Sequence, residues 1–477
     1  MLMYNTTIKD NHNINAFIAT EALESSNKGK QVSRTDYFNE TPDFYLLSNG
    51  FADPAVDWAY ANGFTLFSVF GSADYNYKQK YFATATVRYD KSSRFAGDNK
   101  SDVFPSFSAG WVVSKEDFFN ETGVVNRLKI KASWGELGSQ DLPVNNPTQT
   151  LYAFNQGNAN YVWGGQGNPS AGAIVSQIGN ANLQWEKSIT SNIGVELGFL
   201  ENKLTTSIEF YQITTDGLFA RDNNLIPTTG PEAPAPFVNL GEIKNTGIDW
   251  SVAYNNTWDS GFTFGVLFNL SHYKNEVTSL INGTPITGNA TTSWAGSFTR
   301  TEEGEPISYF FGRKVSGLDD IGRFTYEDVN GDGQINDDDR TKIGSPHPDF
   351  TYGLNLNAGY KGFDLSAFFN GSQGNDVYNQ NLIFTDFPLF VDGNRRTEVL
   401  NAWTPTNTNT KVPALSNSLH GTELNANSYF VEDGSFFRLR NLQIGYSLPA
   451  ATTDKMGMER FSIYLQGTSL FTVTSYS

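Results

Sequence analysis

The sequence predicts an all-β protein, the wall of an antiparallel transmembrane β-barrel, and three observations indicate this fold class. Apolar and polar residues alternate along many segments, several of these segments are long, and short links alternate with long ones. The composition agrees with many strands joined by turns, because aromatic residues make up 14% of the chain and glycine is abundant. At 477 residues the chain is too long for one ordinary globular core.

Alternation with a period of two is the main secondary-structure signal. Ile248, Trp250 and Val252 would share one face of a strand, and Asp249 and Ser251 would share the other. Such runs exceed the usual strand length of about 5–6 residues and suit strands that cross a bilayer at a tilt. Alternation alone also fits a secreted β-sandwich or β-repeat protein with one buried face. The other clear runs are 80–90, 189–199 and 350–360.

The side chains at the two faces and at the run ends also suit a membrane barrel. Aromatic residues near run ends are expected to form interfacial girdles. Basic residues on the polar face would line the lumen, where we expect them to pair with neighbours or to face water. The aromatic residues are Tyr81, Tyr89, Trp111, Trp134, Tyr352 and Tyr360, and the basic residues are Arg88, Lys129, Lys131, Arg438 and Arg440.

The lengths of the links favour a barrel over a sandwich. Outer-membrane barrels alternate short periplasmic turns with long extracellular loops, whereas a sandwich gives no reason for this rhythm. We expect roughly 14 to 16 strands, within the range of such barrels. The short links are Tyr75–Lys80, Glu201–Lys203, Asn256–Gly261 and Lys361–Gly362, and the long stretches are Gly138–Asn182, Asp216–Gly241, Ser316–Pro348 and Gly371–Gly434.

Charge and motif content argue against several other classes of protein. The net charge is −17, so no nucleic-acid partner is expected, since such partners need basic patches. The chain has no cysteine, which excludes disulfides and cysteine metal sites. No segment reaches the roughly 18 consecutive apolar residues of a membrane helix, and the first residues lack a signal-peptide apolar core. The four histidines show no metal spacing and no hydrolase or phosphate-binding motif occurs, so no catalytic residue is predicted and the chain is not expected to be an enzyme.

One segment predicts a structural calcium site within the loop 317–348. Its oxygen-bearing residues have the spacing of a calcium-binding loop, and Gly333 stands where a sharp turn is required. Asp339 replaces the usual closing glutamate, and a solvated acidic turn without an ion remains the alternative. One strand separates this loop from the short Lys361–Gly362 turn, so we expect the loop to be extracellular. The predicted ligands are Asp328, Asn330, Asp332, Gln334 through its backbone carbonyl, and Asp339.

Three stretches resemble SusC-like (SusC/RagA-type) TonB-dependent transporters of Bacteroidota. They are Tyr81–Trp111, with VRYDKSSRFAGDN and VFPSFSAGW, then Glu327–Gly353, EDVNGDGQINDDDRTKIGSPHPDFTYG, and Asn427–Pro449, NSYFVEDGSFFRLRNLQIGYSLP. Weaker similarity covers nearly the whole chain, so residues 1–477 resemble part of the barrel domain. The resemblance implies a 22-stranded barrel, of which this chain would be an incomplete wall without signal peptide, plug domain or closing strand.

The resemblance also implies a function and partners. It implies active import across the Gram-negative outer membrane, in contact with membrane lipid and powered by the TonB–ExbB–ExbD complex. A SusD-like lipoprotein would cover the extracellular face, and the cargo would be an oligosaccharide or, as in some relatives, a peptide. No residue can be assigned a substrate contact by motif. Two alternatives stay open, namely a secreted carbohydrate-binding or adhesive β-protein and a β-rich glycan-degrading enzyme; no acid/base pair stands out for the latter.

Overall fold

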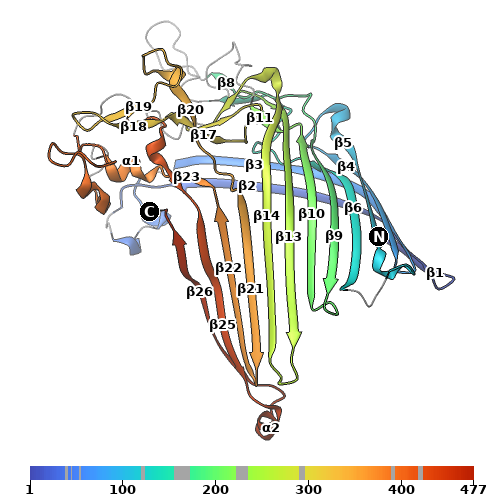
Figure 1. Ribbon diagram of the computed structural model, residues 1–477. Helices are drawn as coiled ribbons and strands as arrows, with labels where there is room; N and C mark the ends of the chain where they lie inside the picture. Colours follow the sequence, from blue (N-terminus) through green and yellow to red (C-terminus); the bar gives the residue numbers. More distant parts are fainter. Residues whose placement is uncertain are drawn as a thin grey trace.

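The computed structural model of the chain is built on one antiparallel sheet of fourteen strands (Figure 1). The strands of this sheet pair in chain order, and shorter strands lie in the connections between them. This confirms the predicted fold class and strand number. In the described residues, no helix is both long and apolar enough to cross a membrane. The described residues are 1–37, 41–44, 46–52, 55–119, 124–154, 172–221, 235–288, 296–387, 393–416 and 423–476.

The elements fall into two groups, the long strands of the main sheet and the short elements of the connections. The strands of the main sheet are β1 (Leu2–Ile8), β2 (His12–Ser33), β3 (Ala55–Tyr77), β4 (Tyr81–Ser92), β5 (Ser101–Val112), β6 (Val125–Ser139), β9 (Glu186–Phe199), β10 (Leu204–Asp216), β13 (Gly241–Thr257), β14 (Thr263–Leu280), β21 (Phe350–Tyr360), β22 (Phe363–Gln373), β25 (Phe436–Ser447) and β26 (Ser462–Thr474). The short strands and helices are β7 (Leu151–Phe154), β8 (Ala173–Gln177), β11 (Phe219–Arg221), β12 (Phe237–Asn239), β15 (Ile286–Thr287), β16 (Thr299–Thr301), β17 (Tyr309–Arg313), β18 (Val315–Leu318), β19 (Phe324–Tyr326), β20 (Arg340–Gly344), β23 (Asp376–Tyr378), β24 (Val431–Asp433), α1 (Asn381–Asp386) and α2 (Ala450–Thr453). The 3-10 turns are η1 (Pro42–Phe44), η2 (Leu47–Asn49), η3 (Gly97–Lys100), η4 (Val113–Lys115), η6 (Ile281–Gly283), η7 (Asp337–Asp339), η8 (Thr397–Asn401), η9 (Ser428–Phe430) and η10 (Asp454–Met456).

The connections separate into a long-loop end and a short-turn end of the sheet. The small strands and α1 gather at the long-loop end, while α2 lies at the opposite end (Figure 1). The β14–β21 connection begins at Ile281, earlier than the predicted Ser316, because β15 to β17 are too short to show a period-two pattern. The long connections are 34–54, 93–100, 140–185, 217–240, 281–349 and 374–435, and those at the short-turn end are 9–11, 78–80, 113–124, 200–203, 258–262, 361–362 and 448–461.

The strand register turns the alternation of each strand into two continuous faces, because directly paired residues point to the same side of a sheet. One cross-strand row on the apolar face consists of Val195, Ile208, Trp250, Leu270 and Tyr352. The adjacent row on the polar face consists of Ser207, Ser251, Asn269, Gly353 and Asn370. Hence the alternation seen in separate segments belongs to a single two-sided wall.

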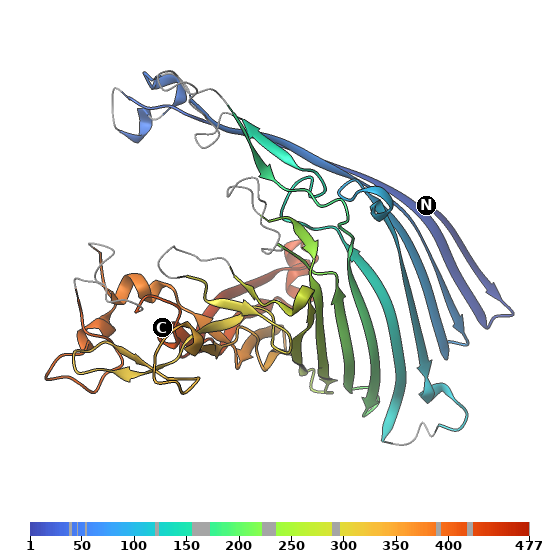
Figure 2. The ribbon, with the colours of Figure 1, turned by 90° about the horizontal axis from the view of Figure 1, so that it is seen from above.

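The wall is curved and open. Figure 2, seen from above, shows the strands following an arc with the loops of the long-loop end on its inner side. β1 and β26 each have one paired neighbour, so the sheet has two edges. The buried apolar clusters lie among the loops and at the ends of the strands, and not on the large apolar face. That face therefore stays exposed, as Phe210 (55%) and Leu465 (77%) illustrate.

The short-turn end is held by a carboxylate in the β5–β6 connection. Glu116 accepts hydrogen bonds from the Tyr81 hydroxyl (2.5 Å), the Trp111 indole N–H (3.0 Å) and the Lys80 ammonium (3.2 Å). These donors come from β4, β5 and the turn that precedes β4. The hydrogen bond from Tyr81, followed by that from Trp111, lowers the pKa of Glu116.

Candidate functional site

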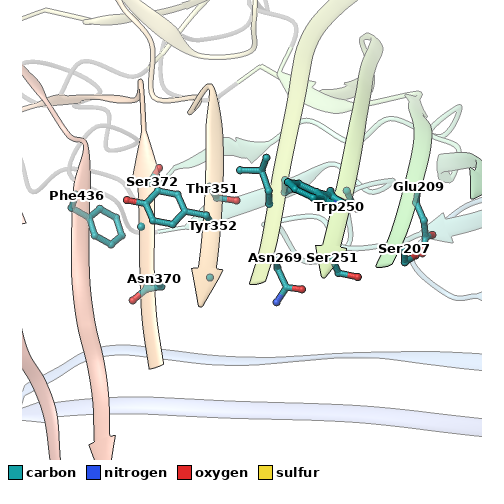
Figure 3. Close-up of a pocket in the computed structure, with 15 residues that line it drawn as sticks. Ser207, Glu209, Trp250, Ser251, Asn269, Thr351, Tyr352, Asn370, Ser372 and Phe436 are labelled. Carbon is teal, nitrogen blue, oxygen red and sulfur yellow. The ribbon is translucent and has the colours of Figure 1, made fainter. Parts of the chain in front are cut away.

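The polar face of the wall carries the first candidate site, a pocket of 480 Å³ between β10 and β25 (Figure 3). Hydroxyl, amide and carboxylate groups from successive strands line it in the register described above. Asp249 accepts a hydrogen bond from the Ser271 hydroxyl and makes no ion pair with any described residue. The buried Asn370 Oδ1 accepts no hydrogen bond from the described part of the chain. The pocket therefore offers polar groups that can exchange hydrogen bonds with a hydrated ligand.

A ladder of charges flanks this pocket on β6, β9 and β10. Lys131 Nζ lies 2.5 Å from Glu209 Oε1 and 3.3 Å from Glu196 Oε1. Arg127 lies 3.2 Å and Lys129 4.0 Å from the same Glu196 carboxylate. The prediction that Lys129 and Lys131 are wall charges paired with neighbours is confirmed. Sequence reasoning missed the partners Glu196 and Glu209, although their positions in alternating runs place them on the polar face.

The other predicted wall charges behave in two ways. The Arg88 guanidinium contacts Asp90 (2.8 Å), Glu21 (3.3 Å) and the Ser68 hydroxyl (2.8 Å), so it is paired as expected. Arg438 donates to the Thr472 hydroxyl (2.9 Å) on the polar face. Arg440, by contrast, falls at a β-bulge between β25 and β26, where the register shifts and no paired residue lies opposite.

The loops at the long-loop end pack into one unit. Phe324 from the β14–β21 connection lies 4.9 Å from Tyr429 of the β22–β25 connection, measured between ring centroids. Asp386, whose side chain is 0% exposed, binds Arg396 at 2.6 Å and accepts a hydrogen bond from the Tyr429 hydroxyl (2.5 Å). Burial and this hydrogen bond raise the pKa of the Tyr429 hydroxyl. These contacts join two loops that are distant in the sequence around a shared apolar cluster that includes Phe430.

The predicted calcium loop forms a compact turn in this unit. Asp328 accepts hydrogen bonds from the backbone N–H groups of Gly331 (2.7 Å) and Gly333 (2.8 Å). Asp332 accepts from the N–H of Gln334 (2.7 Å) and donates its own N–H to Asn330 Oδ1 (2.9 Å). Gly333 has a φ of 78°, so the sharp turn predicted at this position is present.

Asp339 closes the loop by holding its two ends together. Its carboxylate is buried and accepts the N–H groups of Asn336 (2.8 Å) and Val329 (2.9 Å), and these hydrogen bonds, that from Asn336 first, lower its pKa. Arg313 of β17 fixes the same segment by contacting the Asn336 carbonyl (3.1 Å) and Asp337 (2.8 Å). Each carboxylate oxygen has a second lone pair that could still coordinate an ion. In the described residues, however, no three acidic or histidine side chains are arranged to hold a metal, so calcium binding would require the loop to tighten.

The apolar face has the features of a lipid-facing surface. Tyr81 and Trp111, two of the predicted girdle residues, pair directly on this face. Near the short-turn end Trp258, Phe262 and Tyr360 form a further aromatic group, with ring centroids 5.3 and 6.4 Å apart. An apolar surface this wide would associate in water, whereas lipid satisfies it. Two opposite faces, aromatic girdles and alternating loop lengths define a segment of outer-membrane β-barrel wall.

Comparisons with known proteins agree with this class. Residues 4–372 match the family described as "TonB dependent receptor-like, beta-barrel". TonB-dependent receptor P3 of Formosa agariphila is 32% identical over 98% of this chain and 46% of its own length. SusC of Bacteroides thetaiotaomicron is 30% identical over 82% of this chain and 38% of its own length. The structure of the RagAB peptide transporter superposes with a TM-score of 0.81 at 26% identity, covering 99% of this chain and 51% of that one.

The chain belongs to the TonB-dependent receptor β-barrel family, and its similarity to SusC and RagAB places it among the SusC-like members. Proteins of this family reside in the bacterial outer membrane, so the short-turn end is periplasmic and the long-loop end extracellular. The chain spans about half the length of the curated relatives it matches.

Proposed function

We propose that this chain forms part of the wall of an active importer whose cargo is an oligosaccharide. The observation that carries the proposal is the two-sided sheet, with an apolar face for lipid and a polar face lined by Ser207, Asn269, Asn370 and their neighbours. Hydroxyl and amide groups match the donors and acceptors of a sugar. Import would use the TonB–ExbB–ExbD complex as the energy source and a SusD-like lipoprotein as the extracellular lid, as the similarity to SusC and RagAB supports.

A peptide is the second candidate cargo. The similarity to the RagAB peptide transporter favours it, because that structure superposes over 99% of this chain. The amide and hydroxyl groups of the polar face would also bond to peptide backbone, so surface chemistry alone does not separate the two classes of cargo.

Growth and uptake experiments test the proposal. Deletion of the gene should abolish growth on at least one oligosaccharide as sole carbon source, and restoring the gene should rescue it. Uptake of the fluorescent form of that oligosaccharide should stop after addition of a protonophore, because active import needs the proton-motive force. Loss of growth on peptides alone would identify the second candidate, and normal growth on every oligosaccharide and peptide tested would contradict import.

We also propose that the Asp328–Asp339 loop binds calcium as a structural ion, with Asp328, Asn330, Asp332, Gln334 and Asp339 as ligands. The support is the spacing of the oxygen donors and the sharp turn at Gly333. An ion drawing these groups together would stiffen the loop and, through Arg313, the strand β17 that it contacts.

A further inference from the structure

A second cavity on the polar face extends up to the extracellular rim between β3 and β9, and it shares no residue with the pocket of Figure 3. Its volume is 790 Å³, within the size range of small-molecule sites. It is lined by β4, β5, β6 and β9, from Thr84 and Ser108 in the lower part of the wall up to the residues that follow β6. Cargo entering from outside would meet the upper part of this cavity, at Leu137 to Asp141, before the middle of the wall.

The cavity combines an apolar patch with free hydroxyl groups. Leu137 points from the polar face into it and is 69% exposed, which is unusual for a leucine on a hydrated surface. Trp185 and Phe104 form the wall beside it, in T-shaped contact at 5.6 Å between centroids. Four hydroxyl groups of the lining make no hydrogen bond to another side chain or to backbone in the described residues. These hydroxyls belong to Ser106, Ser108, Ser133 and Thr190.

The only basic side chain in the described lining is already engaged. Arg88 is held by Asp90, Glu21 and Ser68, so its guanidinium is not available to an anionic ligand. The acidic side chains on this face of the lining are Asp90 and Asp141, and Glu21 shares Arg88 with Asp90, so carboxylates outnumber the one basic group. Glu136 pairs with Ile189 and points to the apolar face. A carboxylated or sulfated ligand would be repelled, and an uncharged one would not.

The Gln140 side chain carries one further acceptor that has no partner in the described residues. Gln140 holds the loop above the cavity, because its backbone carbonyl accepts a hydrogen bond from Arg94 (3.1 Å). Its side-chain Oε1 is buried and accepts no hydrogen bond from any described residue. Leaving such an acceptor unsatisfied costs about 1–3 kcal/mol, so turning the side chain to meet a ligand hydroxyl would be favoured here.

We infer that this rim cavity is a cargo subsite that selects an uncharged, polyhydroxylated unit with one apolar face, such as a neutral sugar ring. The inference rests on the proposed import function and adds the charge class of the cargo. The apolar side of the ring packs on Leu137 and Trp185, its hydroxyls bond to the free serine and threonine hydroxyls and to Gln140, and the acidic lining rejects polyanionic cargo.

The absence of cysteine from the chain allows a direct test on the purified protein. In the Ser133→Cys variant, thiol-reactive methanethiosulfonates that are neutral or cationic should modify the cavity about tenfold faster than an anionic reagent of similar size. The matched control is Leu200→Cys, in a periplasmic turn where the leucine is 59% exposed and Glu201 and Lys203 offset each other in charge. There the three reagents should react at rates set only by their intrinsic reactivity.

Protection from modification then reports on the cargo. Neutral hexasaccharides (maltohexaose, cellohexaose and mannohexaose) and acidic hexagalacturonate are each added before the reagent. At least one neutral hexasaccharide should slow modification in Ser133→Cys and leave Leu200→Cys unchanged, while hexagalacturonate should not protect. Equal rates for anionic and neutral reagents, protection by hexagalacturonate, or no protection at all would each overturn the subsite. Loss of oligosaccharide uptake on gene deletion is measured separately, so a failed subsite and a failed import function give different results.

Discussion

Replacing Arg396 by methionine should loosen the extracellular loop unit, because it removes the cation that pairs with a fully buried carboxylate. Asp386 is 0% exposed and Arg396 is 21% exposed, and two bonds of 2.6 and 2.7 Å join them. Methionine keeps much of the apolar stem of arginine while removing its charge. The change therefore isolates the ion pair from the packing of the apolar cluster around Phe430.

The magnitude follows from the desolvation of Asp386. Removing one partner of a buried ion pair costs roughly 3–5 kcal/mol, and the lower end applies here because the Tyr429 hydroxyl still donates to Asp386. Since each 1.36 kcal/mol is a factor of ten, about 3 kcal/mol should raise the opening equilibrium of the unit by roughly 100-fold. Tyr429→Phe, which removes a hydrogen bond to a charged group, should cost about 1.5–3 kcal/mol.

Hydrogen exchange of the α1 amides, followed by mass spectrometry on protein in detergent, measures this opening. The matched control is Lys314→Met, which breaks an exposed ion pair with Glu327 (3.0 Å; 53% and 44% exposed). It should change the free energy of opening, obtained from the exchange rates, by less than about 1 kcal/mol. The double variant Asp386→Asn with Arg396→Met should exchange more slowly than Arg396→Met alone. Unchanged α1 exchange in Arg396→Met, or an equal effect of the control, would refute the reasoning.

Three further predictions concern the wall, its periplasmic end and the calcium loop. Hydrogen bonding from Tyr81 lowers the pKa of Glu116, so the stabilisation from its carboxylate is present above the unfolded pKa and is lost as the pH falls through the lower folded pKa. Glu116→Gln should therefore reduce the fall of the melting temperature at acid pH. Val252→Arg on the apolar face should destabilise the protein by about 2–4 kcal/mol in bilayers, whereas the neighbouring Ser251→Arg on the polar face should be tolerated; urea unfolding in liposomes compares the two. Calorimetry should show calcium binding to the Asp328–Asp339 loop and chelator should increase its hydrogen exchange; no heat and no change in exchange would rule out the ion.

The main sheet could be predicted because alternation is a local property of each strand. Once Ile248, Trp250 and Val252 are assigned to one face, any pairing that keeps apolar neighbours together reproduces the observed faces. The register itself does not follow, because a slip of two residues keeps the same faces. The alternation of short and long connections then indicated which strand ends lie at the same end of the sheet. The limits of the strands were less predictable, because β13 continues to Thr257, where the sequence gives way to polar residues before it turns.

The loop unit and the charge pairs could not be predicted, because their contacts join distant segments. Nothing in the sequence around Phe324 indicates that it packs on Tyr429, and the short strands β15 to β17 are too brief to show a period. The same holds for Lys131, whose pairing with Glu196 and Glu209 depends on the register between three strands. In the rim cavity, the exposed Leu137 breaks the polar pattern of its face, and that departure is the signal a sequence analysis could have used.

The most direct test of the central claim is a spin-label scan along β13. Single cysteines are introduced in turn at positions 248 to 254 of the cysteine-free chain, and the accessibility of each label to oxygen and to a water-soluble nickel complex is measured in bilayers. A lipid-facing apolar face predicts oxygen maxima at Ile248, Trp250, Val252 and Tyr254, with nickel maxima at the positions between them. Accessibility without a period of two, or nickel maxima at these four positions, would contradict the assignment of this sheet as an outer-membrane barrel wall.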